Sequence, residues 1–135
     1  MFSDECTVQN DPNKPGCWTF RYPSEKWDPV HVNLTVHGKP TISIMVWGAI
    51  WREGRSKLVF LERDMDSPRK GYSSRSYIQA LEEGLLPEYD GTRHFQQDNA
   101  KIHLSKASMA WLLGHGIALW DWPAHSPDLN PIEHV

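Results

Sequence analysis

The pattern of apolar and polar positions along this 135-residue chain predicts a sheet accompanied by helices. Residues 41–51, TISIMVWGAIW, are β-branched, aromatic and mostly apolar, which is typical of a central strand. Shorter apolar or alternating runs predict further strands at residues 2–8, 17–22, 31–36, 57–61, 94–98 and 117–120. Gly54 lies between two of these runs and predicts a hairpin turn there.

Two longer segments carry apolar residues at helical spacing, and each begins at a serine that can cap a helix. The first helix is expected over residues 73–86, because Pro87 would end it. The second is expected over residues 105–113. A third helix is expected to begin at Pro131, with Asn130 as its N-cap. The order of strands and helices indicates an α/β fold in which helices flank a mixed sheet.

Composition narrows the class of protein. Hydrophobic residues make up 39% of the chain and include seven tryptophans, which is enough for the core of one domain. We expect no membrane span and no signal peptide, because no apolar run is long enough and no basic leader is present. The two cysteines, Cys6 and Cys17, form no CxxC or zinc pattern and are expected to be free thiols.

The charge of the chain is unevenly distributed. The net charge of −3 argues against a dedicated DNA-binding module. Residues 52–75 nevertheless carry seven basic and four acidic side chains. This segment could contact a phosphate backbone, or it could be a solvated loop between strands.

Three acidic residues on different predicted elements are candidates for a cation site. Asp98 ends a predicted strand, where mixed α/β sheets place ligand groups, although an ordinary turn would use an aspartate equally well. Asp4 lies inside the first predicted strand, where aspartate is disfavoured unless that end is frayed. Glu133 follows Asp98 after 34 residues, and by itself it indicates a capping box at a helix start. Asp128 competes for the third position, but its Ser-Pro-Asp-Leu context indicates a turn.

Several neighbouring residues are weaker candidates. Asn99 and His103 follow Asp98 closely, and we expect at most an accessory role for them, since a single histidine is more often structural. Trp120 and Trp122 are interpreted as core residues rather than as surfaces on which bases stack.

Read together, the motifs resemble one family. The segments FSDE, SIMVWGAI, FQQDNAKIH and DWPAHSPDLNPIE, with 34 residues between the second and third acids, closely resemble the catalytic domain of mariner/Tc-type transposases of the DDE superfamily. The resemblance covers nearly the whole chain. Glutamate at the third acidic position resembles the Tc branch more than mariner proper.

The resemblance implies an RNase H-like fold, with a five-stranded mixed sheet flanked by helices and a truncated last helix. It implies that Asp4, Asp98 and Glu133 are the catalytic and metal-binding residues, with two Mg²⁺ ions that Mn²⁺ can replace. Three carboxylates brought together would repel one another, and a pair of cations would relieve that repulsion. The implied reaction is Mg²⁺-dependent cleavage and strand transfer of transposon-end DNA.

The resemblance also implies a domain organisation and partners. Residues 1–135 would form a single catalytic domain, incomplete at both ends, in which residues from about 9 to 40 form a clamp-like insertion. The implied partners are inverted-repeat and target DNA and, in the full-length protein, a second copy of the chain. A nuclear location is implied if the source is a eukaryote.

Two other interpretations stay open. The chain alone is expected to have little or no activity, because the helix-turn-helix modules of the family are not found in it. It could therefore be a catalytically inactive, transposon-derived module for nucleic-acid binding or dimerisation. A host nuclease of RNase H-like type, acting on RNA–DNA hybrids, is the third interpretation.

Overall fold

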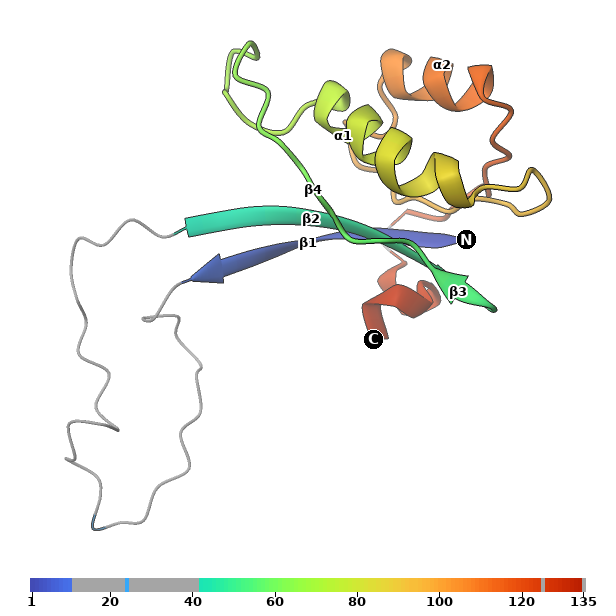
Figure 1. Ribbon diagram of the computed structural model, residues 1–135, viewed down its shortest axis with the longest axis horizontal. Helices are drawn as coiled ribbons and strands as arrows, with labels where there is room; N and C mark the ends of the chain where they lie inside the picture. Colours follow the sequence, from blue (N-terminus) through green and yellow to red (C-terminus); the bar gives the residue numbers. More distant parts are fainter. Residues whose placement is uncertain (11–23, 25–41, 125, 135) are drawn as a thin grey trace. The chain divides into compact units, whose positions relative to one another are not determined.

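The computed structural model describes residues 1–10, 24, 42–124 and 126–134 (Figure 1). The chain divides into two compact units, one formed by Met1–Thr7 together with Ile44–Val135 and the other by Val8–Ser43. The strands predicted at residues 17–22 and 31–36 lie outside the described residues, as does nearly all of the predicted clamp-like insertion. Cys6 is an exposed free thiol as expected, and Cys17 also lies outside the described residues.

The described sheet has four strands, which are β1 (Phe2–Asn10), β2 (Ile42–Trp51), β3 (Gly54–Arg55) and β4 (Val59–Phe60). β2 lies between β1 and the two short strands, and it pairs antiparallel with both β3 and β4. The hairpin between β2 and β3 turns where Trp51 faces Gly54. The predicted first strand, the central strand and the hairpin are therefore confirmed, but the strand predicted at residues 57–61 is reduced to Val59–Phe60.

The strands predicted at residues 94–98 and 117–120 are each reduced to isolated bridges. These parallel bridges join Phe2 to Gln96 and Phe95 to Leu119. The first segment stops early because the Asp98 carboxylate accepts the Ala100 N–H at 2.9 Å, which turns the chain out of extended geometry. Where five strands were expected, the described residues form four strands and two bridges. Parallel and antiparallel pairing both occur, as a mixed sheet requires.

Helix α1 (Ser74–Ala80) begins as predicted, because Ser73 caps it in a capping box with Ser76. The predicted end is wrong. The helix continues through a π-helical turn, η2 (Leu81–Leu85), and a 3₁₀ turn, η3 (Leu86–Glu88). Pro87 lies inside η3 near its start, where a missing N–H leaves no bond unmade.

Helix α2 (Lys106–Gly114) confirms the second predicted helix, with the Ser105 hydroxyl accepting the Ser108 N–H at 3.1 Å. The C-terminal segment instead forms two 3₁₀ turns, η4 (Pro127–Leu129) and η5 (Pro131–His134). The prediction that Asn130 caps a helix here is wrong. Its side-chain amide donates to the Ser3 carbonyl at 3.2 Å, while its side-chain oxygen is buried without a hydrogen-bond partner.

The hydrophobic core lies between the sheet and the two helices, which cover the same face of the sheet (Figure 1). Alternate residues of β2 point to opposite faces. Trp47 and Ala49 are buried under the helices, whereas Gly48 and Ile50 line a hollow on the other face together with Ile132 of η5. The C-terminal turns lie on that second face (Figure 1). None of the helices in residues 1–10, 42–124 or 126–134 has the length and apolar character needed to cross a bilayer.

Gly84 allows the helical layer to approach the sheet closely. A Cβ atom at this position would lie 2.5 Å from the Trp47 ring and 2.9 Å from a Val59 methyl group. Overpacking of a core costs about 1–3 kcal/mol, and alanine in a helix returns up to about 1 kcal/mol. We therefore expect Gly84→Ala to lower the free energy of unfolding by roughly 1–2 kcal/mol in urea denaturation.

The matched control is Gly114→Ala at the end of α2, where a Cβ would meet nothing within 4 Å. This variant is expected to be as stable as the parent chain or slightly more stable. Equal stability of the Gly84 and Gly114 variants would contradict the close-packing explanation.

Candidate active site

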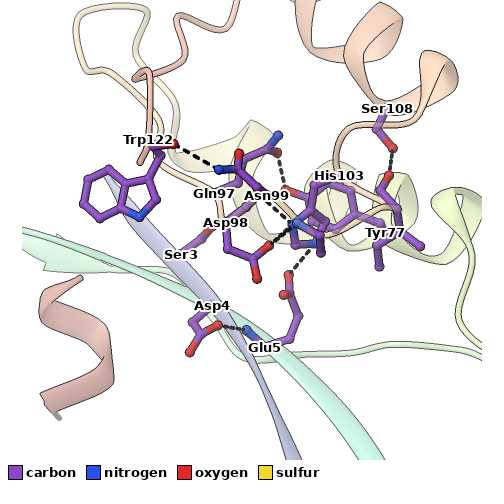
Figure 2. Close-up of polar contacts among 12 residues, drawn as sticks. Ser3, Asp4, Glu5, Tyr77, Gln97, Asp98, Asn99, His103, Ser108 and Trp122 are labelled. Carbon is purple, nitrogen blue, oxygen red and sulfur yellow. Dashed lines mark hydrogen bonds and ion pairs between the residues drawn. The ribbon is translucent and has the colours of Figure 1, made fainter. Parts of the chain in front are cut away.

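An open cleft of about 440 Å³ brings together three distant parts of the chain. All three predicted acids line it, with Asp4 on β1, Asp98 in the turn after the Gln96 bridge, and Glu133 on η5. The remaining lining residues are Gln96, Asn99, Ala100, Trp122, Pro123, Ala124, Ser126, Pro127 and Asn130. Figure 2 shows Asp98 above β1, with its carboxylate pointing toward the part of the strand that carries Asp4.

The acids of the cleft influence one another electrostatically. The pKa of Asp4 is raised to about 6, and partial burial is the largest cause. The hydrogen bond from the Glu5 N–H opposes this shift, while the charges of Glu133, Glu5 and Asp98 add to it. No three His, Cys, Asp or Glu side chains of the described residues are gathered closely enough to form a metal-binding group. The cleft is an acidic surface in which the charges of neighbouring carboxylates disfavour the ionised form of Asp4.

The Asp98 carboxylate is held through one of its two oxygens. Oδ1 lies 2.6 Å from Nδ1 of His103 and accepts the Ala100 N–H at 2.9 Å. Among the described residues, no group hydrogen-bonds Oδ2. One oxygen of this carboxylate thus remains open to the cleft.

His103 lies behind the cleft, where its side chain is only 2% exposed. Its Nε2 atom lies 3.4 Å from Oε1 of Glu5, and its ring centroid lies 4.1 Å from that of Tyr77. Burial acts to lower the pKa of His103, but the hydrogen bond and charge of Glu5 and the charge of Asp98 outweigh it, so the pKa is raised. A histidine placed between two carboxylates is favoured in its protonated form.

Glu5 is a residue of this cluster that was not predicted from the sequence. Strand alternation places Glu5 on the opposite face of β1 from Asp4, and therefore toward the helices. A carboxylate facing a core is costly without a partner, so this position was a usable signal for a buried partner. The sequence named His103 as an accessory candidate, but the spacing did not indicate that it meets Glu5.

Asn99 and Trp122 join the two walls of the cleft. The Asn99 side-chain amide donates to the Trp122 carbonyl at 3.0 Å (Figure 2). Trp122 is half-buried and Trp120 is 44% exposed, and their rings stack with centroids 6.3 Å apart. The prediction that both tryptophans belong to the core is wrong, because the buried core forms between the sheet and the helices and leaves this edge outside.

Residues 1–135 match the protein family described as "DDE superfamily endonuclease". The chain belongs to the DDE endonuclease superfamily. The resemblance to mariner/Tc-type transposases is thereby confirmed, and membership implies an RNase H-like α/β fold for this DDE domain.

Curated transposases of nematodes are similar to the whole DDE domain. The chain is 38% identical to the transposable element Tc3 transposase of Caenorhabditis elegans, over all of this chain and 39% of that protein. It is 34% identical to the Tcb2 transposase of Caenorhabditis briggsae and 31% identical to the Tc1 transposase of Caenorhabditis elegans. Each of those matches covers all of this chain and 48% of the relative. The DDE domain thus spans less than half the length of these relatives.

The third acidic position of the DDE domain had two competing candidates. Glu133 lines the cleft from η5, and its N–H donates to the Asn130 carbonyl at 3.1 Å as part of that turn. Asp128 is exposed in η4 and does not line the cleft, in line with the turn that its context indicated. Of these two candidates, only Glu133 lines the cleft.

Proposed function

We propose that this chain is the catalytic domain of a DNA transposase that cleaves transposon-end DNA and joins it to target DNA in a Mg²⁺-dependent reaction. One observation carries the proposal, which is that Asp4, Asp98 and Glu133 line a single open cleft although they come from three separate elements. The relatives that bear the name transposase support DNA transposition as the process.

The residues of the cleft fit a divalent cation. Mg²⁺ prefers oxygen ligands, and the three carboxylates supply them without any competing cationic side chain among the residues that line the cleft. The raised pKa of Asp4 records the burial and repulsion that a bound cation would offset. We assign Asp4, Asp98 and Glu133 as the ligands of two Mg²⁺ ions, which Mn²⁺ can replace. When bound by these residues, the ions would supply activation of the attacking water or 3′-hydroxyl and stabilisation of the leaving oxygen.

The remaining side chains of the cleft serve position and access. Asp98 presents the free Oδ2 atom because Oδ1 is already occupied. The bond from Asn99 to the Trp122 carbonyl keeps the two walls at a fixed separation. Such fixed geometry matters because phosphodiester chemistry depends on holding the reacting groups in line.

DNA is the partner that the surroundings of the cleft support. Arg55 and Lys57 line the hollow on the second face of the sheet, and Asp4 also lines that hollow. Basic side chains beside an acidic cleft can bind the phosphates that flank the reacting one. The full-length protein is proposed to act as a homodimer in the nucleus of a eukaryote, with residues from about 9 to 40 in the dimer contacts. The 135-residue chain alone is expected to have little activity.

Calorimetric titration of the chain with Mn²⁺ at pH 7.5 tests the cation site directly. We expect saturable binding that Asp98→Asn strongly weakens, because the charge of one ligand is lost. The control is Asp128→Asn, an exposed acid outside the cleft, which should bind as the parent chain does. A parent chain without Mn²⁺ binding would favour an inactive module for nucleic-acid binding or dimerisation. A preference of the full-length protein for RNA–DNA hybrids would favour a host nuclease.

A further inference from the structure

We propose that Glu5 and His103 form a buried positioning pair that orients the Asp98 carboxylate, holding Oδ1 and directing Oδ2 into the cleft. The inference rests on the proposed function, because it assigns two residues that act on the cation only through Asp98. Neither residue lines the cleft.

The Nδ1 atom of His103 is the protonated ring nitrogen that faces Asp98. This atom lies 2.6 Å from Oδ1 of Asp98, and an ionised carboxylate oxygen can only accept a hydrogen bond. Nδ1 therefore carries a proton and donates it. The hydrogen-bond contact of Nδ1 is with the Asp98 backbone carbonyl at 3.3 Å, which can also only accept. Oδ1 accepts the Ala100 N–H and lies in ion-pair contact with the same ring nitrogen. The rotation of the carboxylate is thereby set, and Oδ2 is left as the oxygen that can bind a cation.

The other ring nitrogen of His103, Nε2, faces the Glu5 carboxylate. Nε2 of His103 and Oε1 of Glu5 are both buried, lie 3.4 Å apart, and have no hydrogen-bond partner elsewhere in the residues that the structure describes. Burying a carboxylate without a partner is costly. The burial of Glu5 is therefore explained by the His103 nitrogen that faces it. Glu5 thus holds the ring in the orientation that aims Nδ1 at Asp98.

The pair of Glu5 and His103 is also connected to Asp4. The backbone N–H of Glu5 donates to Oδ1 of Asp4 at 2.8 Å. Figure 2 shows the resulting chain of contacts, which runs from Asp4 through Glu5 and His103 to Asp98. Glu5 therefore contacts Asp4 through its backbone N–H. Its side chain acts on Asp98 through His103.

A purely packing role would not require these nitrogen atoms. The His103 ring lies against Tyr77, and a phenyl ring could fill the same space. An imidazole is needed because carboxylates lie at both of its nitrogens. Hydrogen-bonded groups that orient metal ligands typically change metal affinity or activity by about 10–100-fold when they are removed.

The test compares Mn²⁺ affinity, measured by calorimetry, with stability, measured by urea unfolding, for the 135-residue chain. His103→Phe keeps the ring but removes both nitrogens, and we expect Mn²⁺ affinity to fall about 10–100-fold. His103→Asn places an amide nitrogen near the Nδ1 position and should restore most of that affinity. Glu5→Gln, which keeps the shape, should give a smaller loss and serves if the phenylalanine variant fails to fold.

The matched control is Tyr77→Phe. It removes a hydroxyl that donates to Gln97 at 2.7 Å within the same buried cluster, but that hydroxyl does not contact Asp98. We expect this variant to lose stability and to keep the parent Mn²⁺ affinity. Parent affinity in folded His103→Phe or Glu5→Gln would overturn the positioning role, as would an equal loss in the Tyr77→Phe control.

A measurement without metal separates this inference from the proposed function. In proton NMR of the metal-free chain, we expect a downfield, slowly exchanging Nδ1–H signal from His103 that Asp98→Ala abolishes. Absence of that signal would overturn the pair. If the signal is present but the parent chain does not bind Mn²⁺, the proposed function fails while the positioning pair stands.

Discussion

Asp98→Ala is expected to abolish Mg²⁺-dependent cleavage of transposon-end DNA by the full-length protein, a loss of about 10³-fold or more. The substitution removes the oxygen that His103 and Ala100 leave open to the cleft. Asp4→Ala and Glu133→Ala are expected to have the same effect, since the three acids line one site and act as a unit. The measurement is nicking of a plasmid that carries the inverted repeats, with Mg²⁺ or with a chelator.

The full-length protein is needed for this experiment because the chain spans less than half the length of its curated relatives. Asp128→Ala is the matched control, because Asp128 is an exposed acid five residues before Glu133 and lies outside the cleft. It should cleave as the parent protein does. Cleavage retained by the Asp98→Ala protein would refute the assignment of the acids.

The affinity of the chain for Mn²⁺ is expected to fall steeply below pH 6, approaching tenfold per pH unit. The reason is that the pKa of Asp4 is raised from its ordinary value of 3.8 to about 6. A cation must bind the ionised carboxylate, so a proton competes with it once the pH falls below that pKa. An unshifted aspartate would compete only near pH 4. Calorimetric titrations at intervals from pH 8 to pH 5 measure this dependence.

Asp4→Asn is the control for the pH dependence. This variant is expected to bind Mn²⁺ more weakly at pH 8, because a ligand charge is gone, and to show little further loss between pH 7 and pH 5. A parent chain whose affinity stays constant down to pH 5 would contradict the role of Asp4. So would a variant that loses affinity as steeply as the parent chain does.

Elements whose signals are local were predicted correctly. Ser73 and Ser105 cap their helices as expected, because a cap depends on residues within one turn. The apolar run of β2 forms the strand between β1 and the short strands, because its composition suits burial on both faces. Asp4, Asp98 and Glu133 line one cleft, as the family resemblance implied, and their catalytic role stays a prediction.

The predictions that failed concern residues whose structure depends on more than their neighbours in the sequence. Asn130 has the sequence context of an N-cap, but its amide donates to the Ser3 carbonyl near the other end of the chain. Pro87 was expected to stop the first helix, but it lies at the start of the 3₁₀ turn η3, where its missing N–H is tolerated. Trp120 and Trp122 are apolar enough for a core, but the core forms between the sheet and the helices and does not include them.

The sequence by itself determined the family and the order of the main elements, because motifs and caps are encoded by neighbouring residues. The three acids were expected from the family resemblance, and the tertiary structure brings them to one cleft. Only the tertiary structure decided that Glu5 and His103 stand behind Asp98, since their contacts join β1 to the segment after the Gln96 bridge. The physical reason is that a hydrogen bond requires a fit of about 3 Å between atoms whose separation along the chain carries no information about their distance in space.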